Sequence, residues 1–137
     1  MLHIAKLAVG VASIEHLGNL QLERTAREPP LRHRTRHAPR RQTELLAGGS
    51  LYWVVAGLMC VRQQILDVVE DRFEDGTPAA AFLLHPVLVR TSARATRPFQ
   101  GWRYLLGDAA PSDLAATPGT DELPPSLQAE LHALCLI

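Results

Sequence analysis

A run of seven residues, Ser50 to Ala56, constrains the fold of this chain more than any other segment. It is rich in aromatic and β-branched residues, and apolar side chains occupy both of its alternating faces. Such side chains pack well on a pleated surface, and strands that are apolar on both faces lie inside a sheet. Glycines bound the run at positions 48, 49 and 57. We therefore expect a central strand over residues 50–56.

The segment before this strand predicts helices and one basic strand. Ser13 is a suitable N-cap for a helix, because apolar residues recur at helical spacing from Ile14 to Leu20. Residues 31–37 have arginine on one strand face and histidine on the other, which is typical of an edge strand or an extended surface arm. Residues 42–47 fit a short helix that ends at the two glycines.

The segment after it predicts a long hairpin. Leu58 to Val69 fits a helix or a strand, and its β-branched content favours the strand. Glu74-Asp75-Gly76 is a turn signal, so Ala79 to Leu84 is expected to return beside the first arm. Pro86 should interrupt this pairing with a bulge, after which the strand restarts at Val87 to Val89.

The end of the chain changes in composition. Trp102 to Leu106 predicts a last strand, residues 107–125 have the proline and glycine content of a linker, and Ser126 caps a terminal helix over residues 126–137. We expect a single α+β domain over residues 1–106, with a small, twisted, partly closed antiparallel β-sheet and two or three short helices.

Length and composition limit the class of protein. The chain has 137 residues, 47% of them hydrophobic, which is enough for one conventional core. The uncharged run from Leu51 to Val61 has 11 residues, whereas a membrane span needs ~18 or more, so no membrane association is expected. The two cysteines make no disulfide framework, and a cytoplasmic location is therefore expected.

The net charge of zero conceals two strongly basic segments. Residues 24–41 hold seven arginines against one acid, Glu28, and residues 90–103 add four arginines without an acid. The acids are concentrated in a central turn, Asp67 to Asp75, and in the tail. A GC-rich coding sequence would explain arginine in place of lysine, but it does not explain the clustering. Charge separated in this way favours a polyanionic partner or association between opposite charges.

Arginine and aromatic side chains are interleaved in these basic segments. Guanidinium groups suit phosphates and flat rings suit unstacked bases, which is the combination that single-stranded nucleic acid requires. The candidate binding residues are Arg34, Arg36, Arg40, Arg41, Phe99, Trp102 and Arg103. In the alternative interpretation the tryptophans fill the core of the sheet. We favour that alternative for Trp53, and both alternatives remain open for Trp102.

A second set of residues indicates a pocket. Tyr52, Arg62 and Asp67 are candidates for it, with Asp67 as a general base, although nothing in the sequence positions a nucleophile or an acid beside Asp67. His33 and His37 have a spacing suited to metal ligands, but the surrounding arginines oppose a dication. There is no phosphate loop and no closely spaced cysteine pair, so neither a metal nor a cofactor is expected.

The same segments resemble a small bacterial family defined only as a domain of unknown function, number 1489. The resemblance lies in residues 1–11, 34–57, 61–68 and 97–105, and GGSLYW with RPFQGWRYL are its most specific motifs. It implies no activity. The order of a basic strand, a short helix, two glycines and an aromatic strand is also similar to PUA and ASCH small β-barrels. That similarity implies RNA or modified bases as ligands, by architectural analogy.

Three functions remain open at this point. The leading hypothesis is an RNA-binding or other nucleic-acid-binding module that uses the basic arm and the aromatic loop. The second is a protein-interaction subunit whose basic arm docks an acidic partner or the acidic tail of another copy. The third is a small hydrolase or nuclease that acts on a nucleotide-derived substrate, so the sequence leaves enzymatic activity undecided.

Overall fold

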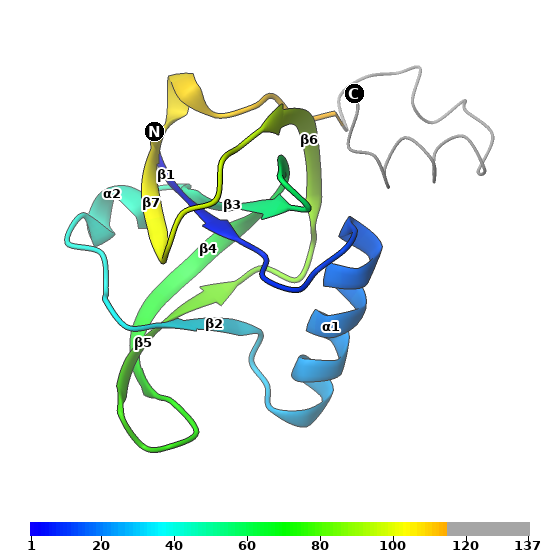
Figure 1. Cartoon of the computed structure of the whole chain (residues 1–137). Coiled ribbons are helices and arrows are strands. Elements are labelled where there is room, and N and C mark those ends of the chain that lie inside the picture. The colour runs from blue at the N-terminus through cyan, green and yellow to red at the C-terminus, as the bar shows by residue number, and fades with distance from the viewer. Residues whose placement is uncertain (115–137) are drawn as a thin grey trace.

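The long strand β4 pairs with three other strands of the sheet, β3, β5 and β6. A computed structural model describes residues 1–114 of the chain. The helices and strands of these residues are β1 (Leu2–Leu7), α1 (Ile14–Arg27), β2 (Arg32–Thr35), α2 (Gln42–Leu46), β3 (Ser50–Val55), β4 (Leu58–Arg72), β5 (Pro78–Leu84), β6 (Val89–Ala95) and β7 (Trp102–Leu106), followed by a 3-10 turn, η1 (Gly107–Ala109). In Figure 1, α1 stands beside the strands and the β4–β5 hairpin projects away from them.

The predicted central strand and hairpin are confirmed. Every residue of β3 is buried. The segment that fitted either a helix or a strand is the first part of β4, in which buried residues 61, 63 and 65 alternate with less buried neighbours. β5 and then β6 run antiparallel along β4, and they are separated by residues 85–88, where Pro86 predicted an interruption. Period-two burial explains why this segment is extended and not helical.

The sheet is mixed, so the expectation of a purely antiparallel sheet is wrong. β1 pairs with β3 in parallel, from Ile4 opposite Leu51 to Leu7 opposite Val54. The chain between these strands contains α1, β2 and α2, a connection long enough to return it in the same direction. The strand order β2-β5-β4-β3-β1-β7 leaves β2 and β7 at its two ends, and the strands are not closed into a barrel.

Both faces of the sheet are covered. α1 begins at the predicted N-cap, where the Ser13 hydroxyl accepts a hydrogen bond from the His16 backbone amide at 3.0 Å. Its Ile14 and Leu17 join the main core with side chains of β1, β3, β4 and β5. A second, smaller core lies on the other pleat around Tyr52 and Val54 of β3. The interior therefore depends on strand alternation, which assigns neighbouring residues to different cores.

The segment after β7 packs on the sheet. Asp113 pairs with Thr91 of β6 in an isolated bridge, and Pro111 is buried. Residues 107–114, which the composition assigned to a linker, therefore contact the domain that precedes them. The rest of the predicted linker and the helix predicted over residues 126–137 lie outside the described residues.

Candidate nucleic-acid interface

The loop of residues 36–41, which we call the arginine loop, is fastened to the edge strand β7. The Trp102 indole Nε1 donates a hydrogen bond to the His37 carbonyl oxygen at 2.9 Å. The Arg41 backbone amide donates to the Tyr104 hydroxyl oxygen at 3.1 Å. These partners are 65 and 63 residues apart along the chain. One end of the first basic segment thus lies against one end of the second, and we call the arginine loop together with β7 the β7 surface.

Tyr104 is the exposed aromatic residue of the β7 surface. Its side of the strand also holds Trp102, whose ring meets the Tyr104 ring edge to face with centroids 5.0 Å apart. Trp102 is only partly exposed, because it also packs edge to face on Phe82 of the core. Tyr104 is 38% exposed, and the Arg41 guanidinium lies 5.6 Å from its ring centroid. Tyr104 is therefore the more exposed of these two aromatic residues.

The other side of β7 carries a second arginine–aromatic pair. Arg103 points away from Trp102, because neighbouring side chains of a strand lie on opposite faces. Its guanidinium carbon is 4.2 Å from the Phe99 ring centroid, a cation–π distance. Phe99 packs against the smaller core with its remaining surface. Phe99 is therefore only partly exposed, and Arg103 beside it is exposed.

The arginines of the basic arm differ in their partners. Arg41 makes a two-pronged contact with Glu44, from Nε to Oε1 at 2.9 Å and from Nη2 to Oε2 at 2.5 Å. This hydrogen bonding lowers the pKa of Glu44 and raises that of Arg41. Arg36 and Arg40 are exposed, and within residues 1–114 neither forms an ion pair. These two charges remain available to a ligand.

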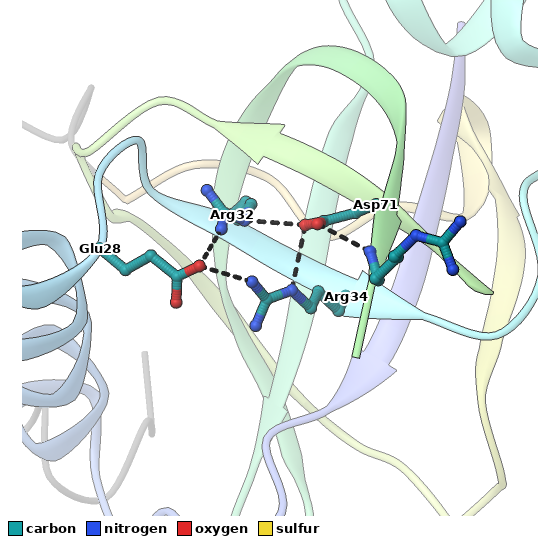
Figure 2. Close-up of polar contacts among 5 residues, drawn as sticks. Glu28, Arg32, Arg34 and Asp71 are labelled. Atoms are coloured by element: carbon teal, nitrogen blue, oxygen red, sulfur yellow. Dashed lines mark hydrogen bonds and ion pairs between the residues drawn. The ribbon is translucent and has the colours of Figure 1, made fainter. Parts of the chain in front are cut away.

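Arg34 belongs to a network of four charged residues (Figure 2). Arg32 and Arg34 lie side by side on β2, and both contact Glu28 and Asp71. Their Nη2 atoms are 2.5 and 2.7 Å from Glu28 Oε1, and their Nε atoms are 2.9 and 3.0 Å from Asp71 Oδ2. A backbone hydrogen bond from Arg72, followed by the contact with Arg34, lowers the pKa of Asp71. Arg34 is therefore drawn towards α1 and β4, away from β7.

Two of the three predicted pocket residues are neighbours, and the third is elsewhere. Tyr52 and Arg62 are paired across β3 and β4. Asp67 lies further along β4, opposite Leu83, and its carboxylate accepts a hydrogen bond from the Val68 backbone amide. The structure places Asp113 beside Arg62 instead, with Nε–Oδ1 and Nη2–Oδ2 distances of 2.7 Å. The sequence grouped Arg62 with Asp67, whereas the structure pairs Arg62 with Asp113, 51 residues away along the chain.

The Arg62–Asp113 pair belongs to a partly buried polar cluster. Arg62 Nη1 also donates to the Ser50 hydroxyl at 3.0 Å, and the Ser50 backbone amide donates to His3 Nδ1 at 2.9 Å. Burial, followed by the nearby Arg62 charge, lowers the pKa of His3. The hydrogen bonds from Arg62 lower the pKa of Asp113. The cluster joins β1, β3 and β4 to the segment after β7, which indicates a stabilising role.

We expect Asp113→Asn to destabilise the fold by about 1 kcal/mol near neutral pH, since the pair is partly exposed and its contribution is screened. A carboxylate with a lowered pKa stabilises the fold above its unfolded value, 3.8, and loses that contribution as pH falls through the folded value. The difference between wild type and variant should therefore shrink below about pH 4. Urea unfolding measured at neutral and acidic pH checks this, with exposed Asp108→Asn as the control. A difference that is independent of pH would contradict the assignment.

The two tryptophans have different surroundings. Trp53 is 4% exposed, and its indole nitrogen donates to Gln63 Oε1 at 2.9 Å, so it is a core residue, as favoured from the sequence. Trp102 joins the core and the surface, and its indole N–H is committed to the arginine loop. The Trp53 ring is buried and cannot stack on a base, whereas the Trp102 ring is partly exposed. Alternation along β7 could have identified Arg103 as facing away from Trp102, but nothing local to the sequence distinguishes Tyr104 from Trp102.

Within the described residues, no group of three or more histidine, cysteine or acidic side chains is placed to hold a metal ion. Over the same residues, no helix is both long enough and apolar enough to span a membrane.

The fold is thus a mostly β structure, with a mixed sheet, two α-helices and a basic aromatic edge strand in the described part of the chain. A family model described as a protein of unknown function (DUF1489) matches residues 4–137, and the chain belongs to that family. No curated protein and no solved structure matches the chain, so the similarity to PUA and ASCH barrels is not confirmed.

Proposed function

We propose that this protein is an RNA-binding module and that the β7 surface is its binding site. The observation that carries the proposal is the attachment of the arginine loop to β7 by the hydrogen bonds of Trp102 and Tyr104. This attachment places the unpaired Arg36 and Arg40 on the loop that contacts the exposed Tyr104. It also fixes the loop backbone, so less conformational entropy is lost when a ligand binds.

The chemistry of the surface supports a single-stranded ligand. Arg36 and Arg40 have no acid to displace before they bind a phosphate. Arg41 follows Arg40 in the chain, Arg103 lies on the opposite face of β7, and both are exposed. Tyr104 offers a ring to an unstacked base, and such stacking contributes ~1 to 3 kcal/mol per base. The guanidinium of Arg103 offers a second flat group, because arginine planes also stack on bases.

Some expectations from the sequence belong to this proposal. A cytoplasmic location in a bacterial cell suits an RNA-binding module, and so does the similarity to PUA and ASCH architecture. Phe99 and Trp102 take a supporting role here, because the first lies under Arg103 and the second holds the arginine loop.

Replacing Arg36 and Arg40 together with alanine should weaken RNA binding about tenfold or more at low salt, because two phosphate contacts are lost. Fluorescence anisotropy with a labelled single-stranded RNA measures the affinity. Both side chains are exposed and unpaired, so the variant should keep its melting temperature.

The matched control is Arg94→Ala. Arg94 is an exposed arginine on β6 that donates to the Ala109 carbonyl oxygen, outside the arginine loop and β7. Its replacement removes one positive charge and should change RNA affinity by less than about twofold. Equal losses per arginine in the two variants would show a non-specific charge effect and contradict the proposed site.

A further inference from the structure

A basic groove lies between the end of α1 and β2, and its lining includes no residue of the arginine loop or of β7. Its volume is about 530 Å³, within the range of sites for small ligands. The charged residues of its lining are Arg24, Arg27, Glu28, Arg32, Arg34 and Glu74. Four arginines face two glutamates, so the lining carries a net positive charge.

Two arginines of this groove converge on one carboxylate oxygen. Arg32 Nη2 and Arg34 Nη2 both contact Glu28 Oε1, as Figure 2 shows. The Arg32 and Arg34 side chains are 17% and 23% exposed, whereas that of Glu28 is 60% exposed. On the other side, Asp71 Oδ2 accepts a hydrogen bond from Arg34 Nε and lies within ion-pair distance of Arg32 Nε. Asp71 therefore anchors the two guanidinium groups, which we call the Arg32–Arg34 fork, and Glu28 on their open side is the more exposed group.

His33 also lines the groove, and its side chain leaves β2 on the face opposite to Arg32 and Arg34. Its Nε2 is buried and has no hydrogen-bond partner within residues 1–114. The ring packs edge to face on Trp53, with centroids 5.3 Å apart. Burial, then the positive charges of Lys6 and Arg24, lowers the pKa of His33 to about 4. His33 is therefore neutral near pH 7, and a negative group in the groove would raise its pKa.

We propose that this groove binds the phosphate group of a phosphate monoester and that Glu28 occupies the Arg32–Arg34 fork when no ligand is bound. A phosphate dianion carries twice the charge of a carboxylate and presents three acceptor oxygens, so it matches two converging guanidinium groups better than Glu28 does. Arg24 and Arg27 lie in the last turn of α1 and offset the negative end of the helix dipole. The site is separate from the proposed RNA surface and does not depend on it.

Replacing Glu28 is expected to increase the affinity for the ligand, whereas most substitutions in a binding site decrease it. Glu28→Gln removes the internal competitor and should raise the affinity for inorganic phosphate and for adenosine 5′-monophosphate about fivefold to tenfold. Isothermal titration calorimetry measures the affinity, and the NMR signals of the His33 ring report occupancy of the groove. A gain of affinity cannot arise from loss of folding.

Control variants separate the groove from general charge effects. Glu70→Gln removes one exposed acid of β4 outside the groove and should leave phosphate affinity unchanged. Arg34→Ala should lower it about tenfold, and adenosine should not bind any variant. Equal affinities of Glu28→Gln and Glu70→Gln, or adenosine binding as tight as that of its monophosphate, would overturn the proposal.

Discussion

Replacing Gln63 with alanine is expected to destabilise the fold by about 3 kcal/mol, because it leaves several buried polar groups unpaired and creates a cavity. Gln63 is fully buried, and its amide uses its full hydrogen-bonding capacity. Its Oε1 accepts from Gln21 Nε2 at 2.8 Å and from Trp53 Nε1 at 2.9 Å. Its Nε2 donates to Gln21 Oε1 at 2.7 Å and to the His85 carbonyl oxygen at 3.1 Å.

The hydrogen bonds of the Gln63 amide connect α1, which borders the groove, to the sheet. Gln21 lies on α1, and Gln63 lies on β4. Urea unfolding compares Gln63→Ala with Gln64→Ala, the exposed neighbour on the same strand, which should change stability by less than about 0.5 kcal/mol. Similar losses in the two variants would contradict the role given to the buried amide network.

A comparably large loss, about 3 kcal/mol, is expected for Gly49→Ala. A Cβ at position 49 would lie 2.4 Å from the Leu2 carbonyl oxygen and 2.5 Å from the Leu45 carbonyl oxygen. Both contacts are with backbone atoms of other elements, β1 and α2, so no side chain can move aside. The Gly49 amide also donates to the Leu45 oxygen at 2.7 Å, which holds α2 against the start of β3.

Gly18→Ala is the control for this prediction. Gly18 lies within α1, where a Cβ would meet only Leu88 Cδ1, at an ordinary contact distance of 3.5 Å. Alanine is the better helix former by ~0.8 to 1.0 kcal/mol, so this variant should be more stable than wild type. Thermal unfolding distinguishes the two. A tolerated Gly49→Ala would show that α2 and β1 approach each other less closely than described.

The strands could be predicted from the sequence because their signals are local. The burial of residues 50–55, the choice of a strand after Gly57 and the break near Pro86 all depend on side-chain alternation and proline chemistry within a few residues. The parallel pairing of β1 with β3 could not be predicted in this way. Periodicity shows that a segment is extended, but it does not show which strand lies beside it or in which direction.

The site was predictable only in part, for the same reason. The sequence identified the basic arm and the aromatic segment, and their contact through Trp102 and His37 is a long-range property. The charge separation noted along the chain is partly neutralised within the domain, because Asp71 of the acidic turn pairs with Arg32 and Arg34, and Arg41 pairs with Glu44. Counting charges by segment cannot reveal these pairs, so it overestimated the arginines available to a partner.

The salt dependence of RNA binding by the wild-type protein tests the proposed function most directly. Contacts of three or four arginines with phosphates predict that the logarithm of the association constant falls with the logarithm of salt concentration with a slope of about −2 to −3. The Arg36→Ala/Arg40→Ala variant should have a slope that is shallower by about 1.4. Binding that does not change with salt, or no binding at low salt, would contradict the assignment of the β7 surface.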